Sequence, residues 1–315
     1  MMAIREYADR IKKEIGKVVV GQDEAIDQVI TAFLAGGHVI LEGVPGLAKT
    51  MLARSFARVI GAAFSRIQFT PDLMPSDIVG TSVFNLQKSK FTFNKGPVFA
   101  NIILADEINR TSPKTQSALL EAMQEKQVTV DGTRYALPLP FMVLATQNPI
   151  EFEGTYPLPE AQLDRFLMKV RIAYPGRDAE LEVLRKFRDG FDTDDFESVP
   201  LKTAGLKPYA ECRKEFDGIR VDENILGYIQ DLAEATRRHR ALLLGVSTRA
   251  AIFLLNAAKF RAALDGRNYV IPDDIKQSAF PVLRHRLLLQ ADAEIEGRGN
   301  DDIITEILES VKVPR

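Results

Sequence analysis

A glycine-rich stretch, "LEGVPGLAKT" at residues 41–50, places a lysine and a threonine directly after a tight turn. It follows the phosphate-binding pattern Gly-x-x-x-x-Gly-Lys-Thr, except that Ala48 replaces the second glycine. In such a loop, backbone N–H groups surround phosphate oxygens. Lys49 would reach the β- and γ-phosphates, and Thr50 would place a hydroxyl on Mg²⁺. The stretch therefore predicts a nucleoside triphosphate site.

The alanine at position 48 is compatible with this prediction if its Cβ points away from the phosphates. Gly43 and Gly46 stand where the loop most needs unusual dihedral angles or close backbone approach. Residue 48 is expected to begin the following helix with a negative φ, where a methyl group adds little strain. Nucleotide contacts are expected along the loop and into the helix, from Gly43, Val44, Pro45, Gly46, Leu47, Ala48, Lys49, Thr50 and Met51.

Two adjacent acids form the second part of the expected site. The segment "IILADEIN" places Asp106 and Glu107 at the end of a buried strand. Asp106 would hold Mg²⁺ through water, because Mg²⁺ keeps several of its waters. Glu107 would orient and polarise the water that attacks the γ-phosphate. The alternative, two solvated carboxylates at a strand end, is disfavoured by the neighbouring phosphate loop.

Three further side chains could complete phosphoryl transfer. Asn148, in "LATQNP", could hold the attacking water or the γ-phosphate, although Asn before Pro is also a common turn. Arg165, in "LDRF", and Arg249, in "GVSTRA", could neutralise charge on the transferred group. Taken singly, each arginine would more often be a surface charge. Arg110 adds a cation beside the acid pair, and its role is left open.

Alternating apolar strands and helices must position these residues. The near-continuous apolar strands predict a sheet covered on both faces, and the strand–helix repetition predicts mainly parallel pairing. Two hairpins interrupt the alternation, at 81–95 and at 127–136, the second with Asp131-Gly132 at its turn. Strands are expected at 38–42, 65–69, 101–107, 141–149 and 166–174. Helices are expected at 3–15, 49–60 and 112–126, and one further helix is expected to end at residue 36.

The pattern changes after residue 175, where helices replace the alternation. An acidic, loop-like connection spans 189–205, and no further strand is expected. The fold predicted is α/β, a three-layer parallel sheet core with nucleotide-binding loops at 1–175, followed by a smaller all-α lid domain at 176–315. Helical segments of this lid are expected at 178–188, 208–216, 222–243, 248–264, 272–290 and 301–311.

Composition sets outer limits on function. Of the 315 residues, 46% are hydrophobic and 27% charged, and the net charge of −2 gives no global attraction to nucleic acid. The single cysteine, Cys212, excludes an internal disulfide and a cysteine metal cluster, and the histidines, His38, His239 and His285, lack ligand spacing. No apolar run reaches the roughly 18 residues of a membrane span, and the N-terminus lacks an apolar signal core. We expect a cytoplasmic, reducing location.

Taken together, these segments resemble the AAA+ ATPases, and specifically the MoxR family. The resemblance depends on "VGQ" at 20–22, the phosphate loop, "LADEINR", "KTQSALLEAMQE", "VLATQNP", "EAQLDRF" and "STRA". It covers roughly residues 15–310. Alanine before the loop lysine is common in this family, so the departure from the general pattern supports the resemblance.

The resemblance implies roles for single residues. Gly21 and Gln22 would lie near the adenine of ATP. Asn148 would be the sensor-1 residue, and Arg249 the sensor-2 residue that reaches the γ-phosphate from the lid. Arg165 would be the arginine finger, which in this superfamily completes the site of a neighbouring copy. An isolated monomer should then hydrolyse ATP poorly.

The resemblance also implies an assembly and partners. The active form would be a ring, a homo-hexamer, with both hairpins near its central pore and the first hairpin as a partner-contacting loop. The family is associated with chaperone-like activation of client proteins, including metal-cofactor insertion. Its members often act alongside proteins with a von Willebrand factor A domain.

Three other functions stay open on the residues alone. A DNA-directed motor of the same superfamily is disfavoured by the net charge and by the second hairpin, whose cations are Lys126 and Arg134. A nucleotide-gated binding module without useful hydrolysis is disfavoured by the joint presence of Glu107, Asn148 and Arg165. A metal chelatase motor subunit is closest to the leading hypothesis, and assays with partner subunits would separate the two.

Overall fold

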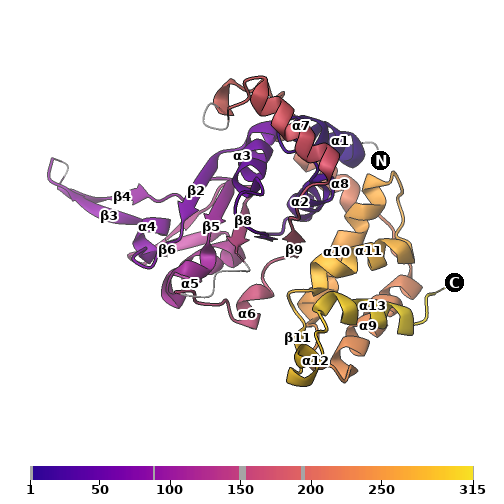
Figure 1. Ribbon diagram of the computed structural model, residues 1–315. Coiled ribbons are helices and arrows are strands. Elements are labelled where there is room, and N and C mark those ends of the chain that lie inside the picture. Colours follow the sequence, from indigo (N-terminus) through magenta and orange to yellow (C-terminus); the bar gives the residue numbers. More distant parts are fainter. Residues whose placement is uncertain (1–2, 88, 149–153, 193–195, 315) are drawn as a thin grey trace.

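A parallel five-stranded sheet forms the centre of the molecule, in the order β2-β5-β8-β1-β9 (Figure 1). The computed structural model describes residues 3–87, 89–148, 154–192 and 196–314. The strands are β1 (Val39–Glu42), β2 (Phe64–Gln68), β5 (Ile102–Asp106), β8 (Met142–Gln147) and β9 (Met168–Arg171). Neighbouring strands pair in parallel throughout. All five strands predicted from the sequence are therefore present.

The sheet is buried on both faces, because side chains alternate in direction along each strand. On one face Val39 and Leu41 pack with α1 (Ala3–Ile15), α2 (Asp23–Ala35) and α3 (Lys49–Ile60). On the other face Ile40 and Ile103 pack with α4 (Pro75–Val79) and α5 (Pro113–Glu125). Because the side chains on both faces of the sheet lie in a hydrophobic core, the strands appear in the sequence as continuous apolar runs.

The strand order brings distant loops together at one edge of the sheet. Strand β8 lies between β1 and β5, so the carboxyl ends of these three strands are neighbours. The phosphate loop follows β1, the acid pair ends β5, and Asn148 follows β8. Ligands of open parallel sheets bind outside such carboxyl ends, where neighbouring connections diverge. The fold therefore assembles the predicted residues at the expected edge.

Both predicted hairpins are present and packed together. The first consists of β3 (Gly80–Asn85) and β4 (Lys90–Lys95) and projects away from the sheet (Figure 1). The second consists of β6 (Gln127–Val130) and β7 (Thr133–Ala136) and turns at Asp131-Gly132, both with positive φ. Phe93 of the first stacks on Tyr135 of the second, with ring centroids 4.2 Å apart.

The C-terminal part is largely helical, as predicted, but the expectation of no further strand is wrong. A two-stranded antiparallel sheet joins β10 (Leu242–Leu244) to β11 (Leu288–Leu289). The sequence prediction had assigned both leucine runs to helix ends, and periodicity alone cannot separate the two states in so short an apolar run. The helices are α7 (Arg177–Arg188), α8 (Lys207–Asp217), α9 (Glu223–Arg238), α10 (Thr248–Leu264), α11 (Pro272–Leu283), α12 (Ala291–Ile295) and α13 (Asn300–Ser310).

Short elements complete the chain. They are α6 (Glu160–Leu163) and two 3₁₀ turns, at Ile108–Arg110 and Phe196–Ser198. Across the described ranges, no helix combines the length and the apolar character that crossing a lipid bilayer requires.

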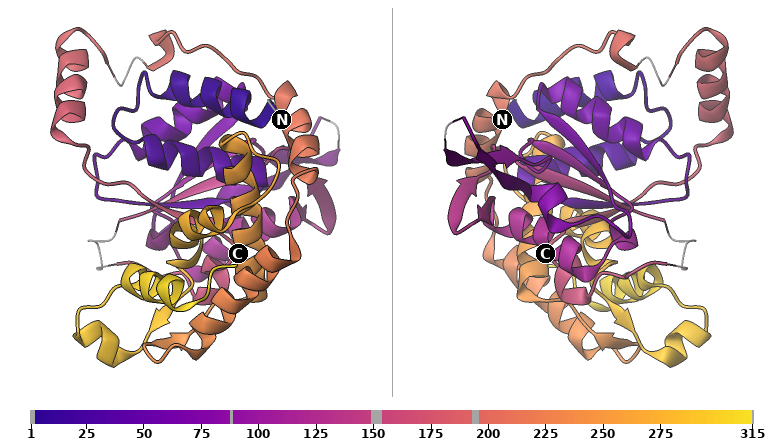
Figure 2. Two further views of the ribbon diagram at one scale, coloured as in Figure 1. Left: turned by 90° about the vertical axis from the view of Figure 1, so that its right-hand side faces the viewer. Right: turned by 90° about the vertical axis from the view of Figure 1, so that its left-hand side faces the viewer.

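Helix α7 stands apart from the other C-terminal helices. In Figures 1 and 2, α7 and α12 lie at opposite ends of the molecule. Helix α7 shares a cavity wall with the phosphate loop, α8 packs on α1, and α9, α10, α11 and α13 pack on one another. The division into two domains at residue 176 stays a proposal. Helix α7 lies against the part of the chain that forms the sheet, because it shares a cavity with the phosphate loop.

Buried polar side chains in this core serve the fold. The N–H of Val143 donates to His38 Nδ1 at 3.0 Å, and His38 Nε2 lies 3.2 Å from the carbonyl of Met123. His38 thus ties β1 to β8 and to the end of α5, and its burial lowers its pKa to about 4. Cys212 is also buried, and burial raises its pKa to about 12. Both residues therefore stay neutral near pH 7.

Candidate nucleotide site

The phosphate loop shows why glycine occupies two of its positions. At Gly43 a Cβ atom would lie 2.6 Å from the carbonyl oxygen of Ile172, so no side chain fits there. Gly46 has open space around it but a φ of +86°, which L-residues rarely adopt. The sequence-based expectation for these two positions therefore has a physical basis in the structure.

The expectation for residue 48 is wrong. Ala48 has φ +57° and ψ +22°, a left-handed conformation, and α3 begins only after it at Lys49. The turn of the loop ends at residue 48, so the left-handed dihedral angles occur at a residue that carries a Cβ atom. An L-residue with such angles stores about 1–2 kcal/mol of backbone strain, which glycine would not. The loop is therefore strained at the residue that precedes its lysine.

Lys49 is folded back onto its own loop. Its Nζ donates to the carbonyl oxygen of Gly43 at 2.6 Å and to that of Val44 at 2.9 Å. Burial lowers the pKa of Lys49, and the nearby carboxylates of Asp106 and Glu107 act in the opposite direction. The ammonium group thus lies within electrostatic reach of both acids, and an anion entering the loop would compete with two carbonyl oxygens for it.

Asp106 is buried and bonded on both carboxylate oxygens. Thr146 donates its hydroxyl to Oδ1 at 2.6 Å. Arg66 of β2 donates to Oδ2 through Nε at 3.1 Å and through Nη2 at 2.6 Å. The side chain of Asp106 is 13% exposed, so its charge is compensated mainly inside the protein.

Glu107 is held in a strained backbone conformation at the edge of the same cavity. Its φ is +56°, again left-handed, and its N–H donates to Thr146 Oγ1 at 2.8 Å. Gln68 donates its amide to Glu107 Oε2 at 2.8 Å, and Arg110 lies 3.4 Å from the same oxygen. Strain of this kind is concentrated at functional sites, where the surrounding structure over-determines the backbone.

Two cavities meet across the phosphate loop. The first, of about 410 Å³, is polar and contains the loop, Lys49, the acid pair and Asn148. The second, of about 490 Å³, is mainly apolar and lies between the loop and α7, with walls from Val18, Val20, Gln22, Met51, Pro175, Glu180, Val183, Leu184, Phe187 and Phe191. Both include Gly46, Leu47 and Ala48. A charged compartment joined to an apolar one matches a nucleotide, with its phosphates and its base.

The turn before α2, which contains Gly21 and Gln22, borders the apolar cavity. Gly21 has φ +73°, and a Cβ atom there would lie 2.7 Å from Cβ of Ala179 and 2.9 Å from Cβ of Pro175. Gln22 donates its amide to the carbonyl of Ala173 at 2.8 Å and lines the cavity. The close approach permitted by Gly21 brings the turn against the start of α7.

The two predicted arginines lie away from both cavities. Within the described residues, neither Arg165 nor Arg249 lines the polar or the apolar cavity. Arg249 instead lies beside Asp164, with Nη1 3.8 Å from Asp164 Oδ2. Arg165, the next residue in the chain, forms no side-chain hydrogen bond or ion pair to any described residue. The structure therefore separates Arg249 from the phosphate loop of its own chain.

Asp164 connects this arginine region to the lid. Ser247, the N-cap of α10, donates its hydroxyl to Asp164 Oδ2 at 2.9 Å and accepts from Ala250 N–H at 3.1 Å. Arg286, almost fully buried, donates Nε to Asp164 Oδ1 at 2.8 Å. The segment that carries Arg165 is thus fixed against the helix that carries Arg249.

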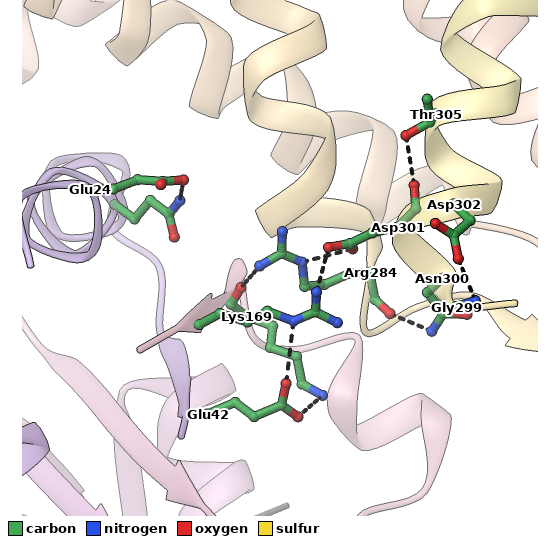
Figure 3. A network of polar contacts seen from close by, with 11 residues as sticks. Glu24, Glu42, Lys169, Arg284, Gly299, Asn300, Asp301, Asp302 and Thr305 are labelled. Atoms are coloured by element: carbon green, nitrogen blue, oxygen red, sulfur yellow. Dashed lines mark hydrogen bonds and ion pairs between the residues drawn. The ribbon is translucent and has the colours of Figure 1, made fainter. Parts of the chain in front are cut away.

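A second set of ion pairs joins the lid to the base of the phosphate loop (Figure 3). Glu42, which directly precedes Gly43, pairs with Lys169 and Arg171 of β9. Arg171 also pairs with Asp301 of α13, and Asp301 accepts from Arg284 Nε at 3.2 Å. These ion pairs therefore connect the lid to β1, the strand that leads into the phosphate loop.

Three site residues escaped the sequence analysis: Arg66, Gln68 and Thr146. Arg66 and Gln68 lie on β2 and contact the acid pair, while Thr146 lies one residue before the end of β8 and bonds to both acids. Each is a polar residue near the carboxyl end of an otherwise apolar strand. That signal could have found them, had the order of β2, β5 and β8 been assumed in advance.

The fold and the site define a nucleotide-binding protein of the AAA class, and comparisons with known proteins agree. Residues 38–168 match the family described as "ATPase family associated with various cellular activities (AAA)". Residues 234–307 match the AAA lid domain. The crystal structure of "a putative ATPase from Cytophaga hutchinsonii ATCC 33406" superimposes with a TM-score of 0.88 at 44% identity, covering 100% of this chain and 98% of that one.

Curated relatives narrow the class. The chain is 42% identical to "Chaperone MoxR1" of Mycobacterium tuberculosis, over 96% of this chain and 81% of that protein. It is 33% identical to "Protein MoxR" of Methylorubrum extorquens, over 98% and 96%. It is 49% identical to the uncharacterized protein YeaC of Bacillus subtilis, over 96% and 93%. The chain belongs to the MoxR family of AAA+ ATPases.

Proposed function

We propose that the protein hydrolyses ATP to ADP and phosphate with Mg²⁺ and uses this cycle to act on partner proteins. The first N–H groups of α3 and the Lys49 ammonium would bind the phosphates. Thr50 and Asp106 would hold Mg²⁺, a fit supported by a hydroxyl and a buried carboxylate on one polar cavity, both hard oxygen donors. Bound Mg²⁺ would neutralise charge on the phosphates.

Glu107 would orient the attacking water and receive its proton. In the structure its carboxylate accepts a hydrogen bond from Gln68 and lies near Arg110. The carboxylate must therefore leave this position to reach a water beside the γ-phosphate. Asn148 lines the same cavity and would hold that water from the other side. Turnover would thus require a movement of the Glu107 carboxylate, whereas nucleotide binding alone would not.

One observation supports the proposal of a shared site. The arginine region, which consists of Asp164, Arg165 and Arg249, lies outside the polar cavity. Arg165 and Arg249 both adjoin Asp164, outside the cavity that holds Lys49. We propose that both arginines serve the site of a neighbouring copy rather than their own. Repetition of such a head-to-tail contact generates a ring when the rotation between neighbouring copies closes. Six copies, as the family implies, are proposed for this ring.

The first hairpin is proposed as the contact for client proteins. Phe84 and Phe91 form an edge-to-face pair and are 48% and 71% exposed. Exposed aromatic side chains of this kind commonly mark protein interaction sites. The chain reaches this hairpin from β2 through α4, and Gln68 of β2 touches Glu107, so one continuous segment connects the proposed client contact to the proposed site of hydrolysis. Client activation with a von Willebrand factor A domain partner is proposed on family grounds.

Specific ATPase activity measured against protein concentration tests the proposed function. A site shared between copies predicts Mg²⁺-dependent activity per chain that rises with concentration, in step with assembly measured by light scattering. Activity per chain that stays constant from monomer to assembly would contradict the shared site. Absence of any Mg²⁺-dependent hydrolysis at assembling concentrations would contradict the enzymatic proposal itself.

The DNA-directed alternative is tested in the same assay. Single- and double-stranded DNA are each added at low and at moderate salt. The proposed function predicts no stimulation, because the net charge is −2 and the second hairpin offers only Lys126 and Arg134 as cations for phosphate binding. Strong, salt-sensitive stimulation by DNA would favour a DNA-directed motor over a protein remodeller.

A further inference from the structure

Arg66 occupies an unexpected place beside the acid pair. It lies on β2 with its side chain on the same side of the strand as Gln68, two residues later, because strand side chains alternate. Its guanidinium bonds Asp106 Oδ2 through Nε and Nη2, and Nη2 also donates to Gln68 Oε1 at 2.7 Å. One arginine therefore contacts both the proposed magnesium ligand and the residue that holds Glu107.

The charge of Asp106 explains why a cation is needed there. A carboxylate that is only 13% exposed is costly to ionise without an opposite charge. Two cations line the cavity that contains Asp106, Lys49 and Arg54, and Lys49 is bonded to the carbonyls of Gly43 and Val44. Among the ion pairs of the described residues, the partner of Asp106 is Arg66.

We propose that Arg66 is the counter-ion of Asp106 in the nucleotide-free protein and that it competes with magnesium for this carboxylate. The inference rests on the proposed function, since it concerns the metal that accompanies ATP. Two cations at one carboxylate repel each other, so the approach of Mg²⁺ weakens the Arg66 contact. The Arg66 side chain is 49% exposed, which allows its guanidinium to move into water.

The competition extends to Glu107 through one amide. Arg66 donates to the oxygen of the Gln68 amide, and the nitrogen of that amide donates to Glu107 Oε2. Displacement of Arg66 removes the bond that orients this amide. Arrival of the metal at Asp106 therefore loosens the contact that keeps Glu107 away from the attacking water, and Arg66 acts as a positioning residue.

Nucleotide binding titrated with Mg²⁺ tests the competition. The full-length wild type and Arg66→Gln are given a fluorescent, non-hydrolysable ATP analogue, first in EDTA and then with increasing Mg²⁺. We expect Arg66→Gln to lower the half-saturating Mg²⁺ concentration by about 5-fold or more, the usual range for coupled sites. Affinity for the metal-free analogue should change by less than about 2-fold, because Arg66 contacts Asp106 and Gln68 rather than the loop.

Arg110→Gln is the matched control. Arg110 is also a half-exposed arginine beside the acid pair, but it lies 3.4 Å from Glu107 instead of bonding Asp106. Its removal reports the general effect of losing one positive charge near the site. Arg66→Lys, which keeps the charge without the two-nitrogen contact, should fall between wild type and Arg66→Gln and serves if the glutamine variant fails to fold.

The outcomes separate the two proposals. If the wild type binds the analogue without any effect of Mg²⁺, the proposed function fails. If the wild type shows the effect but the half-saturating concentration in both Arg66 variants equals or exceeds that of Arg110→Gln, the Arg66 inference alone fails. A larger shift in the Arg66 variants than in Arg110→Gln supports it.

Discussion

The polar cavity at the phosphate loop and the arginine region at Asp164 differ in how their charges are satisfied. In the cavity, Lys49 is bonded to two carbonyls, and Asp106 is bonded to Arg66 and Thr146. In the arginine region, Arg165 has no side-chain partner among the described residues, and Arg249 is separated from Asp164 by 3.8 Å. The first region is internally balanced, while the second presents cations outward.

This difference indicates a division of labour. The balanced region has everything required to bind a nucleotide: a loop, a helix N-terminus, a lysine and two acids. The outward cations can stabilise charge that develops only during phosphoryl transfer, and only on an acceptor brought to them. Removal of a phosphate-binding residue of the first region, such as Lys49, should therefore abolish binding, whereas changes in the second region should spare binding and reduce turnover.

Lys49→Ala should have the largest effect and acts on the first region. Loss of a charge-assisted contact to the phosphates should weaken ATP binding by about 100-fold or more, since each 1.4 kcal/mol is a factor of ten. Isothermal titration calorimetry measures this directly. Lys276→Ala, at a surface position on α11, is the control and should bind as the wild type. Retained tight binding in Lys49→Ala would end the assignment of this loop.

Arg249→Ala tests the second region, the arginine region at Asp164. We expect turnover to fall by about 10- to 100-fold, less than for loss of an arginine finger, while the dissociation constant for ATP changes by less than about 3-fold. Steady-state kinetics together with equilibrium binding separate the two quantities. Arg240→Ala, at an exposed position near the lid, should leave both unchanged. Loss of binding in Arg249→Ala would instead place this arginine at the phosphates of its own chain.

Ala48→Gly should have the smallest effect, and its sign is diagnostic. Glycine relieves the left-handed strain at residue 48, so the free energy of unfolding should rise by up to about 1 kcal/mol. Urea unfolding measures the change. Ala210→Gly, at an exposed position inside α8, should show the opposite sign by about 1 kcal/mol. Destabilisation by Ala48→Gly would mean that the alanine is not strained.

Most of the sheet and the first-region residues could be predicted from the sequence, because local patterns encode them. Apolar runs located the strands, and the phosphate loop and acid pair stand at fixed places after two of them. The C-terminal end of helix α3 was predicted at its observed residue, since Gly61 ends the helix with a positive φ. The conformation of Ala48 was missed because the dihedral angles of a loop depend on its closure, not on one residue's preference.

The remaining site features depend on strand order and on packing between distant segments. Arg66 and Thr146 meet Asp106 only because β5 lies between β2 and β8. The position of Arg249 depends on how α10 docks against Asp164, through contacts between residues more than eighty positions apart. Single-sequence periodicity contains no information on either arrangement.

Mixing two inactive variants tests the shared site most directly. Arg165→Ala keeps an intact acid pair, and Glu107→Gln keeps an intact arginine, so each should be inactive alone. In random mixed rings about a quarter of the contacts would join a good acid pair to a good arginine. A mixture of Lys49→Ala with Glu107→Gln, both defective in the same region, is the control and should stay inactive.

The shared site predicts that the Arg165→Ala and Glu107→Gln mixture recovers hydrolysis well above the sum of its components. Mixed assembly is verified in the same sample by capture through a tag on one variant. Mixed assemblies that form but hydrolyse no more ATP than the two variants separately would contradict a site completed by a neighbouring copy.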